Sequence, residues 1–198
     1  MRKNYKLTIQ YDGSDFHGWQ MQAKGRTVQG DIEDALTVIY PEEKITLIGA
    51  GRTDTGVHAL GQVANISLPS KHTAAELQKA INGNLKQDVR IDMVEDADDD
   101  FHARFSATAR VYEYHMVKHF SPVKRNYTTP LKWQVDRQLL KECADLLLGE
   151  HDFTSFCKVT AEVDHKRCIV HSAYWEETEE MFIFKIMANR FLQHMVRY

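Results

Sequence analysis

The chain reads Gly51-Arg52-Thr53-Asp54-Thr55-Gly56-Val57-His58 between two apolar, strand-like segments, 45–50 and 62–67. A loop between two strands that contains two glycines can present a single side chain into a cleft. Arg52, two residues before the carboxylate, is placed to pair with it. The pattern therefore predicts that Asp54 acts as a nucleophile or a base. A polar turn in which Asp54 bonds its own backbone is the alternative interpretation.

The residues around this loop follow strand and helix patterns. Alternating apolar side chains predict a strand over 4–11. Thr27 is a candidate N-cap for a helix with an apolar face of Val28, Ile32, Leu36 and Ile39. We further predict strands over 44–50, 61–67 and 89–94, and a helix over 73–82 with Thr73 as its cap.

The second half of the chain repeats this plan. It predicts a strand over 108–118, an amphipathic helix over 136–148, a hairpin of strands 169–177 and 181–188, and a helical stretch near Phe191, Met195 and Val196. This order of elements predicts an α+β protein in which α/β layers place helices on a mixed, mostly antiparallel sheet. We expect two similar domains, residues 1–105 and 106–198, with the boundary near residue 105.

The composition excludes several classes of protein. Charged residues make up 27% of the chain and hydrophobic residues 43%, and no apolar run approaches the roughly 18 residues of a membrane span. The N-terminus runs directly into a strand pattern, so we expect no signal peptide. Cys143, Cys157 and Cys168 are odd in number and lack metal-ligand spacing. They predict reduced thiols, a cytoplasmic protein and no metal site.

A net charge of −3 is unusual for a protein that binds nucleic acid, because neutralised phosphates supply much of the affinity. The local field in a cleft matters more than the total charge, however. Acidic residues gather at 95–100 and 176–180, whereas cations lie near the motifs that follow, among them Arg26, Arg52, Arg104, Arg110, Arg190 and Arg197. A basic groove is therefore compatible with the sequence.

Four further stretches accompany the first one, in a fixed order. They are Tyr11-Asp12-Gly13 with Gly18-Trp19-Gln20; Arg26-Thr27-Val28-Gln29; 101–107 leading into Arg110-Val111-Tyr112-Glu113-Tyr114; and 189–192 with His194-Met195-Val196-Arg197. Together with residues 51–58 and Gly61-Gln62-Val63, they resemble the motifs of the TruA family of tRNA pseudouridine synthases. The resemblance spans nearly the whole chain. In that family some tens of residues follow the last motif, so the resemblance implies a C-terminally shortened chain.

The resemblance implies a fold, an activity and partners. Both halves would contribute to one extended sheet with a central cleft. The activity would be isomerisation of uridine to pseudouridine at positions 38–40 of the tRNA anticodon arm, without a cofactor or metal, by a homodimer. Asp54 would be essential. It would attack the base or the ribose covalently, or abstract a ribose proton to give a glycal, and the sequence leaves these routes open.

The resemblance also implies roles for other residues. Tyr112 would lie against the target base and remove the carbon 5 proton, although a core aromatic is the alternative. Arg197 would pair with Asp54, although a solvated arginine is the alternative. Arg52 would fill the space that the flipped base leaves. The RNA-binding residues would be Phe101, His102, Ala103, Arg104, Phe105 and Arg110.

Two rival functions stay open. One is an RNA-binding protein of the same fold without catalysis, which would bind tRNA and leave uridine unchanged. The other is a glycoside-type hydrolase that uses Asp54 with Asp12, which requires two carboxylates roughly 5–9.5 Å apart.

Overall fold

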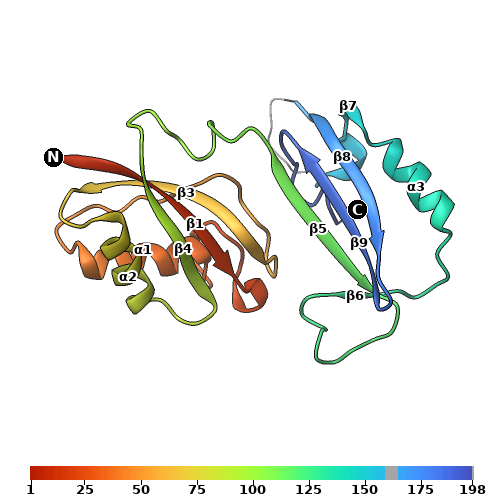
Figure 1. The fold of residues 1–198 in the computed structure, drawn as a ribbon, viewed down its shortest axis with the longest axis horizontal. Helices are drawn as coiled ribbons and strands as arrows, with labels where there is room; N and C mark the ends of the chain where they lie inside the picture. The colour runs from red at the N-terminus through yellow and green to blue at the C-terminus, as the bar shows by residue number, and fades with distance from the viewer. Residues whose placement is uncertain (159–164, 198) are drawn as a thin grey trace. The chain divides into compact units, whose positions relative to one another are not determined.

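A computed structural model describes residues 1–158 and 165–197 (Figure 1). The chain divides into two compact units, Met1–Ala107 (unit 1) and Thr108–Tyr198 (unit 2). The functional division that the sequence analysis places between residues 105 and 106 stays a prediction.

Unit 1 is a four-stranded antiparallel sheet with the strand order β2-β3-β1-β4. β1 (Arg2–Tyr11) lies between β3 (Ala59–Pro69) and β4 (Val89–Ala97), and β2 (Ile48–Gly49) pairs with β3. The alternating apolar residues of β1, Tyr5, Leu7 and Ile9, are fully buried. They share one core with side chains of two helices, α1 (Val28–Ile39) and α2 (Ala74–Asn84). Figure 1 labels both helices beside the sheet.

The helices of unit 1 begin where side chains cap them. The Thr27 hydroxyl accepts a hydrogen bond from the Gly30 backbone N–H. Thr73 and Glu76 form a reciprocal capping box at the start of α2. Such caps satisfy N–H groups that have no partner inside the helix, and they confirm both predicted helix starts.

Unit 2 contains a five-stranded sheet with the order β6-β5-β9-β8-β7. The central antiparallel strands are β5 (Arg110–Val117), β9 (Met181–Ala188) and β8 (Arg167–Glu177). β6 (Thr129–Pro130) and β7 (Gly149–Asp152) form the edges, and α3 (Arg137–Asp145) packs against β8 (Figure 1). Two short 3₁₀ helices, η1 (Gly13–Asp15) and η2 (Thr154–Phe156), complete the described elements.

The α+β class is confirmed. Within each unit the strands form one hydrogen-bonded sheet, of four strands in unit 1 and of five strands in unit 2. Residues 98–109 between β4 and β5 contain turns but no strand. The single extended sheet that the resemblance implies stays a prediction.

Three predicted elements differ clearly from the structure. The strand predicted over 44–50 is reduced to β2, because Leu47 exchanges its backbone hydrogen bonds with the side chains of Gln29 and Glu33 on α1. The helix predicted over 136–148 ends at Asp145 and continues as a turn. The predicted helical stretch at 191–196 contains a turn at 193–197 and no helix, since His194 has a left-handed φ of 67°.

Candidate active site

Asp54 lies half-buried in the connection between β2 and β3, in residues 51–58 (the Asp54 loop). The Gln62 side-chain amide donates to the Gly51 carbonyl at 2.9 Å. Within the loop, the Val57 N–H donates to the Asp54 carbonyl at 3.2 Å. Gly56 takes a left-handed φ of 76°, which favours glycine. The loop is therefore an ordered turn that presents one carboxylate.

A second loop, residues 12–19, packs against the Asp54 loop. The Trp19 N–H donates to the Thr53 carbonyl at 3.1 Å, and the Gly56 N–H donates to the Phe16 carbonyl at 3.3 Å. The Gly13 N–H donates to His58 Nδ1 at 3.0 Å. Apart from Asp12 in the hydrolase alternative, no residue of this loop is predicted to have a catalytic or RNA-binding role.

Tyr112 lies on β5, on the same face as Arg110 and Tyr114. These three side chains are half-buried, whereas Val111 and Glu113 between them are exposed, as strand alternation predicts. The Tyr112 ring packs edge-on against Phe191, with 4.8 Å between centroids. The Arg110 guanidinium donates to the Asn189 carbonyl at 2.8 Å. Two of the sequence motifs, 110–114 and 189–192, thus lie together.

The predicted RNA-binding stretch 101–105 is a turn with one buried anchor. The Ala103 side chain is buried, and its N–H donates to the side chain of Asn65 at 2.9 Å. Phe105 is 76% exposed, and its ring lies 4.3 Å from that of His102 and 5.6 Å from the Arg104 guanidinium carbon. Phe101 offers its carbonyl to Asn4. The stretch therefore exposes Phe105 and Arg104, while Ala103 holds it in place.

The two remaining predicted residues are surface arginines. Arg52 is exposed in the Asp54 loop of unit 1. Arg197 is exposed in unit 2, in the turn where its N–H donates to the His194 carbonyl at 2.8 Å. Of the predicted site residues, Asp54, Arg52 and 101–105 belong to unit 1, and Arg110, Tyr112 and Arg197 belong to unit 2.

The sequence profile of a family described as tRNA pseudouridine synthase matches residues 7–106 and 143–198. The chain belongs to this family. The matched ranges contain the Asp54 loop, the 101–105 turn and Arg197, whereas Arg110 and Tyr112 lie between them. This finding confirms the family that the sequence motifs indicated.

Individual proteins of this family are similar over almost the whole chain. A tRNA pseudouridine synthase A from Listeria monocytogenes serotype 4b is 40% identical over 196 residues, which is 98% of this chain and 79% of that protein. The protein of that name from Bacillus subtilis strain 168 is 40% identical over 97% of the chain and 79% of its own length. The one from Brachyspira hyodysenteriae is 43% identical over 98% and 79%, respectively.

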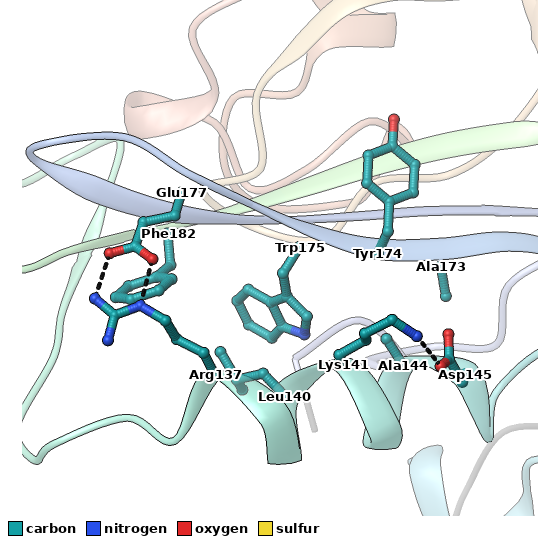
Figure 2. Close-up of a pocket in the computed structure, with 10 residues that line it drawn as sticks. All are labelled: Arg137, Leu140, Lys141, Ala144, Asp145, Ala173, Tyr174, Trp175, Glu177 and Phe182. Atoms are coloured by element: carbon teal, nitrogen blue, oxygen red, sulfur yellow. Dashed lines mark hydrogen bonds and ion pairs between the residues drawn. The ribbon is translucent and has the colours of Figure 1, made fainter.

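This family member also has a groove of about 310 Å³ between α3 and the β8–β9 hairpin (Figure 2). Trp175 points from β8 toward α3 and lines the groove, and Arg137 bonds Glu177 at one end through two hydrogen bonds of 2.6 and 2.8 Å. Arg137, followed by Lys118, lowers the pKa of Glu177 to about 2. None of the predicted site residues lines this groove, so we do not assign the reaction to it.

The described residues contain no group of three or more His, Cys, Asp or Glu side chains that could hold a metal ion. No helix among them is long and apolar enough to cross a bilayer.

Proposed function

We propose that this chain converts uridine to pseudouridine in the anticodon arm of tRNA, at positions 38–40. The observation that carries the proposal is the Asp54 loop, an ordered turn with one half-buried carboxylate inside the residues that match the synthase family. The reaction is an isomerisation in which the bond from the ribose to uracil N1 breaks and a bond to carbon 5 forms. It consumes no oxidant, reductant or energy donor, so acid–base and nucleophilic groups suffice.

Asp54 is the residue that begins the reaction in this proposal. As a carboxylate it attacks the base or the ribose, or it removes a ribose proton to give a glycal. Arg197 pairs with Asp54 and orients it. Tyr112 lies against the uracil and takes the proton from carbon 5 as that carbon becomes bonded to the ribose. The edge-on contact with Phe191 supports a fixed ring orientation for Tyr112.

RNA binding in this proposal uses the exposed part of the 101–105 turn and three cations. Phe105 offers an aromatic face, and stacking on such a face contributes about 1–3 kcal/mol per base. Arg104 and Arg110 bind the RNA backbone, and Arg52 fills the place of the flipped base. We also propose that the protein acts in the cytoplasm as a homodimer, which would extend the basic surface available to one tRNA.

The structure disfavours the hydrolase alternative. Asp12 Oδ1 accepts hydrogen bonds from the backbone N–H and the hydroxyl of Ser14, at 3.0 and 2.6 Å. It caps η1, which is a structural task for the carboxylate that a hydrolase would need as its second acid.

Tritium release from tRNA labelled at uracil carbon 5 tests the proposal. The parent chain is expected to release tritium, and Asp54→Ala is expected to release none while still binding tRNA. Asp34→Ala, which changes an exposed carboxylate on α1, serves as the matched control and should match the parent. Binding without release by the parent would indicate the non-catalytic alternative. Equal release by parent and Asp54→Ala would refute the role of Asp54.

A further inference from the structure

The loop 12–19 approaches the Asp54 loop so closely that only glycine fits at two of its positions. A Cβ atom on Gly13 would lie 2.0 Å from the Val57 carbonyl oxygen. One on Gly18 would lie 2.5 Å from the Thr53 carbonyl oxygen, and Gly18 has a left-handed φ of 89°. Because backbone contacts backbone there, the geometry of one loop is transmitted to the other.

One side-chain contact reinforces this backbone contact. The Tyr11 hydroxyl lies 2.9 Å from the Thr53 hydroxyl, in hydrogen-bonding distance. Tyr11 is the last residue of β1, is 4% exposed and belongs to the core of unit 1. Its ring lies 6.2 Å from that of Trp19. Because the Tyr11 ring is buried and packed, its hydroxyl has little freedom to move. The hydrogen bond therefore holds the Thr53 hydroxyl in place.

Thr53 directly precedes Asp54. Its backbone carbonyl is held by the Trp19 N–H and its side chain by Tyr11, so Thr53 is restrained at both groups. Restraint of this residue sets the direction in which the Asp54 carboxylate leaves the backbone. A displacement of about 1 Å at a reacting group can slow a reaction by about 100-fold.

We propose that Tyr11 is a positioning residue for the reaction. Its hydroxyl fixes Thr53 and thereby orients Asp54, without touching the substrate. This inference rests on the proposed function, because its kinetic consequence requires the reaction. The ordering of the Asp54 loop does not depend on activity.

Four variants and their kinetics test the inference. Tyr11→Phe removes one hydroxyl and Thr53→Val removes the other, and each is expected to lower kcat about 10-fold with KM for tRNA unchanged. Thr53→Ser keeps the hydroxyl and is expected to restore most of kcat. The double variant Tyr11→Phe/Thr53→Val should be no slower than either single variant, because the two hydroxyls act through one bond.

Hydrogen–deuterium exchange of peptides covering 51–58 gives a readout that needs no catalysis. Exchange should be faster in Tyr11→Phe and Thr53→Val and like the parent in Thr53→Ser. Gly83→Ala is the control, since a Cβ at Gly83 meets no atom within 4 Å. Unchanged exchange in Tyr11→Phe, or equal kcat for Thr53→Ser and Thr53→Val, would overturn the inference. A parent without tritium release refutes the proposed function, and the exchange data then decide whether Tyr11 orders the loop.

Discussion

Two buried asparagines support the surface that we propose for RNA. Asn65 donates to the Asn4 side chain at 3.1 Å and accepts from the Ala103 N–H at 2.9 Å. Asn4 donates to the carbonyls of Asp98 and Phe101 at 2.9 and 2.8 Å. Side-chain amides in the core of unit 1 thus satisfy backbone groups of the 98–105 turn, which lets the turn leave the sheet and expose Phe105.

Asn65→Leu is expected to lower the free energy of unfolding by about 1–3 kcal/mol, because it leaves the Ala103 N–H and the Asn4 amide without their buried partner. Urea denaturation measures this change. Asn84→Ala, which removes an exposed amide that bonds only its own helix, should cost much less. Equal effects of the two substitutions would contradict the anchoring role of Asn65.

Arg26 joins three segments that are distant in sequence. Its guanidinium donates to Asp31 on α1 and to Asp88 before β4, at 2.9 and 2.8 Å, and lies 4.2 Å from the centroid of the Phe16 ring. The hydrogen bond from Arg26 holds the pKa of Asp88 below its ordinary value of 3.8. The ionised form of Asp88 therefore stabilises the folded state.

The stability that Asp88 contributes is complete above pH 3.8 and is lost as the pH falls further, through the lower pKa of the folded state. We expect Asp88→Asn to lower the free energy of unfolding at pH 7 by about 1–2 kcal/mol. The difference from the parent should shrink as the pH is lowered from 5 to 3. Urea denaturation at several pH values measures it, and a difference that grows on acidification would show that the sign is wrong.

At the scale of the elements, α3 depends on its N-cap residue, Asp136. The Asp136 carboxylate accepts hydrogen bonds from the N–H groups of Gln138 and Leu139, at 2.9 and 3.1 Å. The helix has nine residues and only Ala144 is buried, so packing adds little to it. Asp136→Ala should lower stability by about 1 kcal/mol, seen as a lower Tm in thermal unfolding. Asp136→Asn retains the acceptor and should stay close to the parent; a Tm as low as that of Asp136→Ala would contradict the capping role.

Elements with a local signal were predicted from the sequence. The alternation in β1 and the caps Thr27 and Thr73 are properties of neighbouring residues, and all three predictions are confirmed. The strand over 44–50 was predicted too long, since its pairing is set by side chains of α1 that precede it by 14 and 18 residues. The edge strands β6 and β7 have only two and four residues. These are too few for an alternation of apolar and polar side chains to be recognised in the sequence.

The candidate site divides in the same way. The prediction of Asp54 rests on the short motif around it, and the structure shows that this motif forms an ordered turn. The sequence does not predict the long-range contacts that hold this turn and the 101–105 turn. Tyr11 meets Thr53 across 42 residues, and Asn65 meets Asn4 across 61. A single sequence does not reveal such pairs, because the residues next to a buried tyrosine or asparagine do not indicate which distant residue it contacts.

At the scale of the molecule, the two units differ in the number of side chains that their cores bury. The core of unit 1 contains 20 buried residues, among them Trp19, Tyr5 and Phe16, whereas that of unit 2 contains ten, among the described residues. The largest fully buried side chains all lie in unit 1. Because buried apolar area is the main stabilising contribution, we expect unit 2 to open more readily than unit 1.

Native-state hydrogen exchange measures this difference. Backbone amides in β8 and β9 should exchange at lower denaturant concentration than those in β1 and β3, because local opening reflects the burial of each unit. A single exchange midpoint for all four strands would show that the chain unfolds as one cooperative body.

The place of β1 inside the first sheet has a consequence for synthesis. β1 leaves the ribosome before both of its partners, β3 at residues 59–69 and β4 at residues 89–97. At a translation rate of about 5–20 residues per second, β1 waits on the order of ten seconds before its second neighbour exists. Until β3 has emerged the apolar strand has no pairing partner, and until β4 has emerged one of its edges is open to association with other nascent chains. The sheet that carries the Asp54 loop is therefore complete only once β4 has arrived.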